Sequence, residues 1–281
     1  MTSRLSNVEA RIGSAEQLLA VVTAMRGIAA ARSHEARTHL EGIRAYSESI
    51  GNAISRALPL LPSKTAISFG AAEPGHAIIA ISAGQGFAGS FSERVLDATV
   101  AIMEEDPQSR LLMIGDRGLM VAAERNVAVE WTAPMVAHVA QIADLASRIM
   151  ETLYDRLDTG ELSRVTMVYT TLGEAGQLDI LCRPLIPFDY RRFPPSRSAQ
   201  PPLITLPAQR LVTQLAEEYV FAELCEALTL SFAAENEART RSMIAAKSNV
   251  GRTLDGLVSL SRQLRQEEIT NEIIELSAGN V

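Results

Sequence analysis

The chain has 281 residues, of which 47% are hydrophobic and 21% are charged, enough to bury one sizeable core together with an extended part. Its formal charge of −7 argues against nucleic acid as a main partner, because neutralising phosphates requires a basic surface. Cys182 and Cys225 form no CxxC motif and the four histidines lack ligand spacing, so we expect no disulfide framework and no metal site.

Residues 1–57 are predicted to form one very long helix with coiled-coil periodicity. No proline interrupts this segment before Pro59, and about 55 helical residues would span roughly 80 Å, too long for one compact domain. Gly27 lies inside the helix and costs roughly 1 kcal/mol relative to alanine. Apolar or small residues recur at steps of three and four, which packs one helix along another; they are Leu5, Val8, Ile12, Ala15, Leu19, Val22, Ala29, Ala36, Leu40, Ile43, Ile50 and Ile54.

A linker at 58–75, marked by three prolines, leads into a predicted α/β domain at 76–183. Apolar runs of strand length occupy 76–82, 111–115, 127–131 and 165–171, and the segments 91–105, 118–125 and 139–157 between them have helical spacing. This alternation predicts a Rossmann-like domain with a mostly parallel, doubly wound sheet. Residues 177–182 follow the last run too closely for a crossover helix, which predicts a hairpin with an antiparallel edge strand.

Residues 184–207 contain seven of the 12 prolines and are predicted to form a second linker, because such a stretch cannot continue a helix or a central strand. Residues 208–281 again have helical spacing and no proline, which predicts a second coiled-coil helix. Neither long segment buries its apolar seam alone. Antiparallel pairing of the two is the simplest solution, and a bundle of shorter helices is the alternative.

The segment 84–89 matches GxGxxG, follows an apolar strand and precedes a helix, as in dinucleotide-binding proteins. Gly84, Gly86 and Gly89 would let the backbone approach a pyrophosphate, and Asp116 could bind a ribose. A nucleotide-binding oxidoreductase is therefore one alternative. The other interpretation is a tight turn whose glycines serve packing, since Asp116 is farther along the chain than expected and no hydride-transfer residues follow.

The other sequence patterns indicate no catalytic site and no bound cofactor. There is no P-loop and no GxSxG or HExxH motif, and the pairs Glu217–Glu218 and Glu267–Glu268 are interpreted as solvated helix faces. Any ATP chemistry would therefore belong to a partner. A non-catalytic coiled-coil scaffold is a further alternative. Since no leader segment and no apolar run near about 18 residues occurs, we expect a soluble, cytoplasmic protein.

Three stretches of the chain resemble the gamma subunit of F-type ATP synthases. Residues 23–32 (TAMRGIAAAR) resemble the motif of its N-terminal helix, and 82–89 (SAGQGFAG) its turn after the first central strand. Residues 265–276 (RQEEITNEIIEL) are similar to its C-terminal signature, with Glu235, Arg239, Met243 and Asn249 at the family's spacing upstream. The resemblance runs in order over nearly the whole length and implies the same fold, an antiparallel terminal coiled coil with a Rossmann-like central domain.

The resemblance implies a central rotor shaft that couples ion-driven rotation of a membrane c-ring to conformational change at ATP sites on beta subunits. The implied partners are the alpha and beta subunits, the epsilon subunit and the c-ring, at the cytoplasmic face of a bacterial inner membrane. Some departures, such as residues 18–22 (LLAVV) and Gln85, suggest a divergent branch such as the N-type ATPases. By family resemblance, the beta-subunit contacts are Arg265, Gln266, Thr270, Glu272, Met25 and Arg26.

Overall fold

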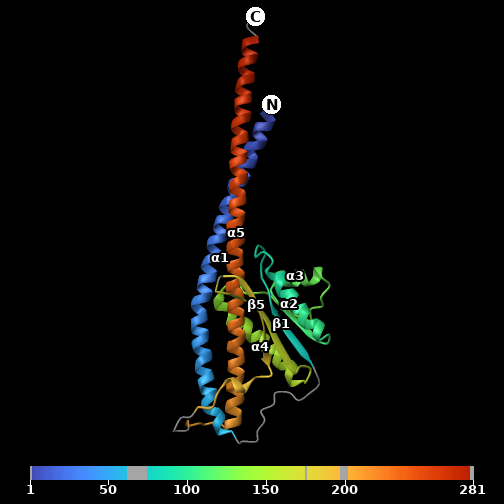
Figure 1. Cartoon of the computed structure of the whole chain (residues 1–281), viewed down its shortest axis with the longest axis vertical. Helices are drawn as coiled ribbons and strands as arrows, with labels where there is room; N and C mark the ends of the chain where they lie inside the picture. The colour runs from blue at the N-terminus through green and yellow to red at the C-terminus, as the bar shows by residue number, and fades with distance from the viewer. Residues whose placement is uncertain (1, 62–74, 175, 197–201, 279–281) are drawn as a thin grey trace. The chain divides into compact units, whose positions relative to one another are not determined.

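The computed structural model describes residues 2–61, 75–174, 176–196 and 202–278 (Figure 1). Its contacts divide the chain into two compact units. We call residues 31–238 the α/β unit, and residues 1–30 together with 239–281 the two-helix unit. The predicted linker at 58–75 lies largely outside the described residues, and the division into five segments by composition stays a prediction.

Each end of the chain forms one continuous helix, α1 (Thr2–Ala57) and α5 (Ala208–Ala278), so the alternative of several shorter helices is wrong. The cross-helix pairs in the α/β unit establish the direction of the two helices. The side chain of Arg44 bonds Glu226 at 2.9 Å, and Tyr46 bonds Glu218 at 2.8 Å. Residue numbers fall in α5 as they rise in α1, which confirms the predicted antiparallel pairing.

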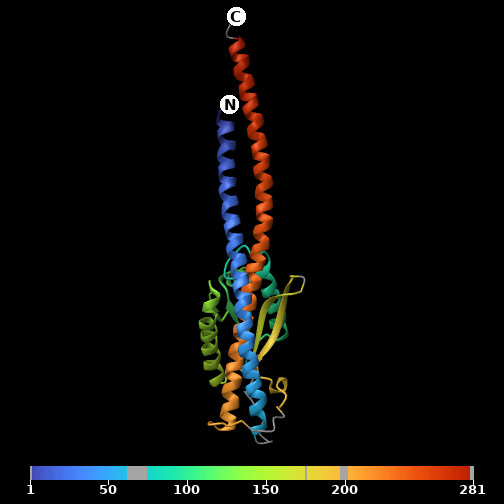
Figure 2. The ribbon, with the colours of Figure 1, turned by 90° about the vertical axis from the view of Figure 1, so that its left-hand side faces the viewer.

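The two-helix unit is held together by a narrow apolar seam of the predicted spacing. Val8, Val22 and Ala29 of α1 are buried, as are Met243 and Leu257 of α5. Figures 1 and 2 both show α5 continuing past the N-terminus of α1 within this unit. Among the described residues, the last turns of α5 in this unit therefore have no helix beside them.

The α/β unit contains a five-stranded sheet in the order β3-β2-β1-β4-β5. The pairs β1–β2, β1–β4 and β2–β3 are parallel, whereas β4–β5 is antiparallel, which confirms the predicted mostly parallel sheet and its hairpin edge. The strands are β1 (His76–Ile81), β2 (Arg110–Ile114), β3 (Trp131–Ala133), β4 (Arg164–Leu172) and β5 (Leu178–Ile186).

Helices cover both faces of this sheet because successive strand side chains point to opposite sides. Ile78 and Ala80 of β1 face α2 (Phe91–Glu105) and α3 (Asp116–Glu124). Ile79 and Ile81 face α4 (Ile142–Asp158) and the parts of α1 and α5 in this unit. Three short 3-10 segments, η1 (Leu58–Leu60), η2 (Val139–Gln141) and η3 (Tyr190–Arg192), complete the described elements.

Two elements differ from the sequence expectation. The strand predicted at 127–131 is displaced to Trp131–Ala133, because the Val127 N–H closes the end of α3 by donating to the carbonyl of Ala122. The strand β5 continues through Pro184, which pairs with Thr166. This is possible because β5 is an edge strand, where a missing N–H breaks no inner ladder.

Candidate partner-contact surface

The predicted contact residues near the C-terminus are gathered around one cross-helix ion pair in the two-helix unit. The guanidinium of Arg265 donates to the carboxylate of Glu9 at 2.9 Å, and both side chains are largely exposed. Glu9 was not among the predicted residues. The pair fixes the position of Arg265 relative to α1 and leaves most of its five N–H donors available.

Gln266, Thr270 and Glu272 are exposed on the turns of α5 that follow Arg265. The hydroxyl of Thr270 donates to the backbone carbonyl of Gln266 at 2.8 Å, so it is used within the helix. Large apolar side chains are exposed among these polar ones, at Ile269, Ile273 and Ile274. We call the exposed residues of α5 from Arg265 to Ile274 the tip surface; its mixture of polar and apolar groups is typical of a surface that contacts another protein.

Met25 and Arg26 belong to a different level of the same unit. Met25 is half-buried in the seam, and Arg26 is exposed. About 16 residues separate Glu9 from Met25 along α1, or roughly 24 Å of helix, so Met25 and Arg26 do not join the tip surface. Three large apolar side chains are exposed near them on α1, namely Leu18, Val21 and Ile28.

The GxGxxG segment forms the turn between β1 and α2 and packs against α5. The backbone N–H of Gln85 in this turn donates to the buried carboxylate of Glu235 at 3.4 Å. A carboxylate at this place would repel a pyrophosphate. Asp116, the predicted ribose ligand, is exposed at the start of α3. These contacts favour the packing interpretation of the turn over nucleotide binding.

Polar side chains on the α/β-unit part of α5 bond to several other elements. Glu223 is buried, and its carboxylate accepts a bond from Arg192 at 2.6 Å. On the next turns, the hydroxyl of Ser231 accepts from the backbone N–H of Thr170 in β4 at 3.0 Å. From α1, the Ser33 hydroxyl donates to the carbonyl of Ala233 at 3.2 Å. This part of α5 is therefore the centre of its unit, with strands and helices bonded around it.

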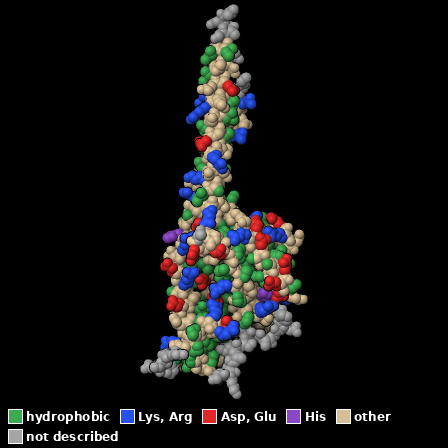
Figure 3. Space-filling view, in the orientation of Figure 1, with side chains coloured by type: hydrophobic (Ala, Val, Ile, Leu, Met, Phe, Trp, Pro, Cys, Tyr) green, Lys and Arg blue, Asp and Glu red, His purple; other side chains and the backbone are tan. Residues whose placement is uncertain are grey.

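Within the part of the chain that the structure describes, no three His, Cys, Asp or Glu side chains are grouped as metal ligands would be. Among those same residues, no helix combines the length and the apolar character needed to cross a bilayer. Figure 3 shows acidic and basic side chains mixed over the visible face of the α/β unit, with no large surface of one sign.

Two very long terminal helices, antiparallel to each other, with a Rossmann-like α/β segment between them in the sequence define the class: an α/β protein with a terminal coiled coil. The family model described as ATP synthase matches residues 4–280, and the chain belongs to this family.

Individual relatives support this family membership over nearly the whole length of the chain. The ATP synthase gamma chain of Ruminococcus albus is 24% identical over 287 residues, covering 99% of this chain and 98% of the relative. That of Salinibacter ruber is 25% identical over 300 residues, covering 99% and 97%. The rotor structure of the Euglena gracilis mitochondrial ATP synthase matches 96% of this chain with a TM-score of 0.64 at 14% identity. The central stalk and c-ring structure from Tetrahymena thermophila matches 80% with a TM-score of 0.56 at 16% identity. These structures share the fold.

Proposed function

We propose that this chain is the gamma subunit of an F-type ATP synthase or ATPase, its central rotor shaft. The observation that carries the proposal is the family match over residues 4–280, with relatives named ATP synthase gamma chain aligned over 99% of the chain. The subunit has no active site of its own. It binds the alpha and beta subunits, the epsilon subunit and the c-ring, and it lies as a peripheral subunit at the cytoplasmic face of a bacterial inner membrane.

The shaft acts as a ligand that rotates. Its surface is asymmetric, so each beta subunit meets a different face of it and binds that face with a different affinity in its open and closed states. Such a difference in affinity is what shifts a conformational equilibrium. Rotation driven by ion flow through the c-ring thereby changes the ATP sites of the beta subunits in turn.

The tip surface is the proposed contact with a beta subunit, and Arg265 is its central residue. An arginine can bond two carboxylates at once because its guanidinium has five N–H donors in one plane. Glu9 occupies only one side of the group in the free chain. A carboxylate of the beta subunit would bind the remaining donors, and Glu9 would keep the guanidinium oriented toward it. Gln266, Thr270 and Glu272 surround this contact.

Met25 and Arg26 are proposed to contact beta subunits at a second level of the shaft. Here the neighbouring exposed residues Leu18, Val21 and Ile28 are apolar. A contact made of such side chains depends little on salt, unlike the tip contact, since screening acts on charges. The segment 184–207 and the α/β unit are proposed to hold the epsilon subunit and the c-ring loops.

The proposal is tested by co-expressing the chain with alpha and beta subunits of an F-type ATP synthase from the same organism and purifying through a tag on beta. We expect the chain to co-purify in a defined complex that hydrolyses ATP. A chain that stays separate from both subunits would overturn the assignment.

The tip surface is tested in the complete membrane-bound complex with the double variant Arg265→Ala and Gln266→Ala. We expect the chain to remain folded and assembled while ion pumping per ATP hydrolysed falls. Arg262→Ala is the matched control, because Arg262 is also an exposed arginine, one turn earlier on α5. Pumping and ATPase rates of the double variant equal to those of the control would contradict the tip assignment without contradicting the subunit assignment.

A further inference from the structure

Two hollows of the α/β unit lie along α4. The first, between α4, α1 and α5, has a volume of about 430 Å³, and the second, between α4 and α5, has one of about 410 Å³. Both are open to solvent, and Phe221 of α5 lines both. They therefore form one groove, which we call the α4 groove. Its size is in the range of surface sites that hold a ligand or part of another protein.

The first hollow has an apolar floor. Val139 of η2 and Ile142 of α4 are buried there, and Phe221 of α5 is half-buried. The walls stand apart because their residues are small: a Cβ on Gly42 of α1 would meet nothing within 4 Å, and Ala143 of α4 is exposed. A floor of this kind loses contact with water when another apolar surface covers it, which favours binding.

The second hollow is acidic. Glu151 of α4 and Glu217 and Glu218 of α5 line it. Within the described part of the chain, none of these three carboxylates is in an ion pair. Glu218 accepts a hydrogen bond from the Tyr46 hydroxyl at 2.8 Å. Burial, followed by the charges of Glu218 and Asp158, raises the pKa of Glu217, so its negative charge is not compensated.

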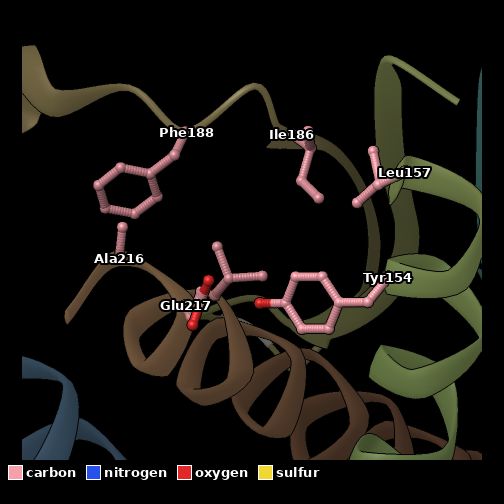
Figure 4. Close-up of a pocket in the computed structure, with 7 residues that line it drawn as sticks. Tyr154, Leu157, Ile186, Phe188, Ala216 and Glu217 are labelled. Carbon is pink, nitrogen blue, oxygen red and sulfur yellow. The ribbon is translucent and has the colours of Figure 1, made fainter. Parts of the chain in front are cut away.

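Tyr154 marks the acidic end of the groove. Its ring points from α4 toward α5, where Glu217 lies (Figure 4). The space behind the ring, on the side of Ile186 and Phe188, is about 20 Å³, which is room for about one water. A partner therefore lies over Tyr154 and Glu217 and does not insert between them.

The walls of the α4 groove favour a helix as its occupant. They consist of helices, whose backbone groups are bonded within each helix, so an extended peptide would find no backbone partners there. A helix satisfies its own backbone and needs only side-chain contacts. The groove-lining residues of α4 recur at steps of three and four and extend over about 16 Å, or about three helical turns; they include Ala143, Ser147, Glu151 and Tyr154.

The charge around the groove favours a cationic occupant. On α4, the exposed acidic residues Asp144 and Asp155 outnumber the exposed Arg148. The three carboxylates of the second hollow add to this negative charge. Such a surface attracts a basic segment and repels an acidic segment or an anionic lipid surface.

We propose that the α4 groove binds a basic amphipathic helix of a partner polypeptide. The apolar face of that helix covers Val139, Ile142 and Phe221, and its lysine or arginine side chains lie beside Glu151 and Glu217. Apolar contacts supply most of the binding, and the charged contacts select the partner and fix its direction in the groove. The inference goes beyond the proposed shaft function and does not rest on it.

The groove is tested on the full chain alone with two fluorescent synthetic helices of about 18 residues, one of leucine and lysine and one of leucine and glutamate in the same pattern. We expect the leucine–lysine helix to bind at least about tenfold more tightly, measured by fluorescence anisotropy. Ala143→Arg places a long cationic side chain in the groove and should weaken this binding at least about tenfold. Ala123→Arg, the matched control, makes the same charge change at an exposed alanine of α3, on the other side of the sheet, and should bind like the original chain.

No binding of the leucine–lysine helix, equal binding of the two helices, or equal losses in the two variants would overturn the proposal. The natural occupant is tested by placing the photo-cross-linking residue p-benzoylphenylalanine at Ala143 in the assembled complex. We expect a cross-link to a helix of another subunit that has lysine or arginine on its polar face. A cross-link to an acidic segment, or none, would overturn the proposal. A complex that does not assemble would contradict the shaft function instead, and the two synthetic helices would still test the groove.

Discussion

The guanidinium of Arg265 donates to the carboxylate of Glu9 at 2.9 Å, although the two residues are 256 positions apart in the chain. Exposed ion pairs of this kind contribute little to stability, because water and salt screen them. We therefore predict that Glu9→Gln changes the free energy of unfolding by less than about 1 kcal/mol, measured by urea denaturation. Because Glu9 orients Arg265, the same variant should lower ion pumping per ATP in the assembled complex. A loss of stability well above this value would contradict the prediction.

Glu217 should make the stability of the chain depend on pH. Its pKa in the folded chain is raised, first by burial and then by Glu218 and Asp158, so the folded state disfavours its charge. At low pH the Glu217 carboxyl group is protonated in both the folded and the unfolded state, so it does not lower the free energy of unfolding. As the pH rises above the unfolded pKa of about 4.3, ionisation of Glu217 begins to destabilise the folded state. The destabilisation reaches its full size above the folded pKa. Glu217→Gln should thus be more stable than the original chain at neutral pH but not at about pH 4. Urea denaturation of both chains at neutral pH and at about pH 4 checks this prediction. A stability difference between the two chains that is equal at both pH values would contradict it.

The bond between Arg192 and Glu223 should stabilise the α/β unit. Glu223 is buried and Arg192 is about one-third exposed, so removing the arginine leaves a buried charge whose remaining ion-pair partner among the described residues is Arg183 at the longer distance of 3.8 Å. We predict that Arg192→Ala destabilises the chain by about 2 kcal/mol, reduced from the value for a fully buried pair because of this exposure. Arg44→Ala, which breaks the more exposed pair with Glu226, should cost less than about 1 kcal/mol. Equal losses of unfolding free energy in Arg192→Ala and Arg44→Ala, measured by urea denaturation, would contradict the prediction that the buried pair is the stronger one.

Two glycines should respond to alanine in opposite ways. A Cβ on Gly118 would meet the Cβ of Ser82 at 2.4 Å and the sulfur of Met113 at 2.8 Å. Gly118→Ala should therefore destabilise the α/β unit by about 1–3 kcal/mol. Around Gly27 of α1 nothing lies within 4 Å of such a Cβ. Gly27→Ala should stabilise the chain by about 0.5–1 kcal/mol, because alanine favours the helix. Thermal unfolding of both variants checks the signs.

The two cysteines should differ in reactivity. Cys182 is exposed on β5, whereas Cys225 is buried and has its pKa raised to about 12 by that burial. Only the thiolate reacts readily with alkylating reagents. We predict that iodoacetamide modifies Cys182 in the folded chain while Cys225 reacts only after unfolding. Partial burial also raises the pKa of Cys182, so its rate should still increase above pH 8.5, the usual value for a thiol. Mass spectrometry of peptides from the treated chain measures both.

Much of the fold could be predicted because its signals are local. The helix at 91–105 was predicted with the bounds that α2 has, and the hairpin of β4 and β5 followed from the short spacing between two apolar runs. The strand near 127–131 was misplaced because the apolar residues Val127 and Val129 pack under α3 instead of joining the sheet. An apolar run shows that a segment is buried, but it does not show which neighbour provides its hydrogen bonds.

The candidate sites were less predictable because they combine distant parts of the chain. Arg265 could be chosen from the C-terminal motif, but Glu9 could not, since helical periodicity does not fix the register between α1 and α5. The small hollow beside Glu217 is likewise lined by Tyr154 from α4 and by Phe188 from the chain after β5. Nothing in the sequence near Glu217 marks these neighbours.

The bonds that surround α5 in the α/β unit have a mechanical consequence. Ser231 is bonded by β4, and Ala233 by α1. Two residues apart in a helix correspond to about 200° of rotation, so these bonds lie on nearly opposite sides of α5. A torque that turned the sheet and this part of α1 together about α5 would load both bonds at once, and slippage would have to break them together. The sheet and residues 208–238 of α5 are thus expected to turn as one body. Twisting of α5 is then expected in residues 239–278, which belong to the two-helix unit.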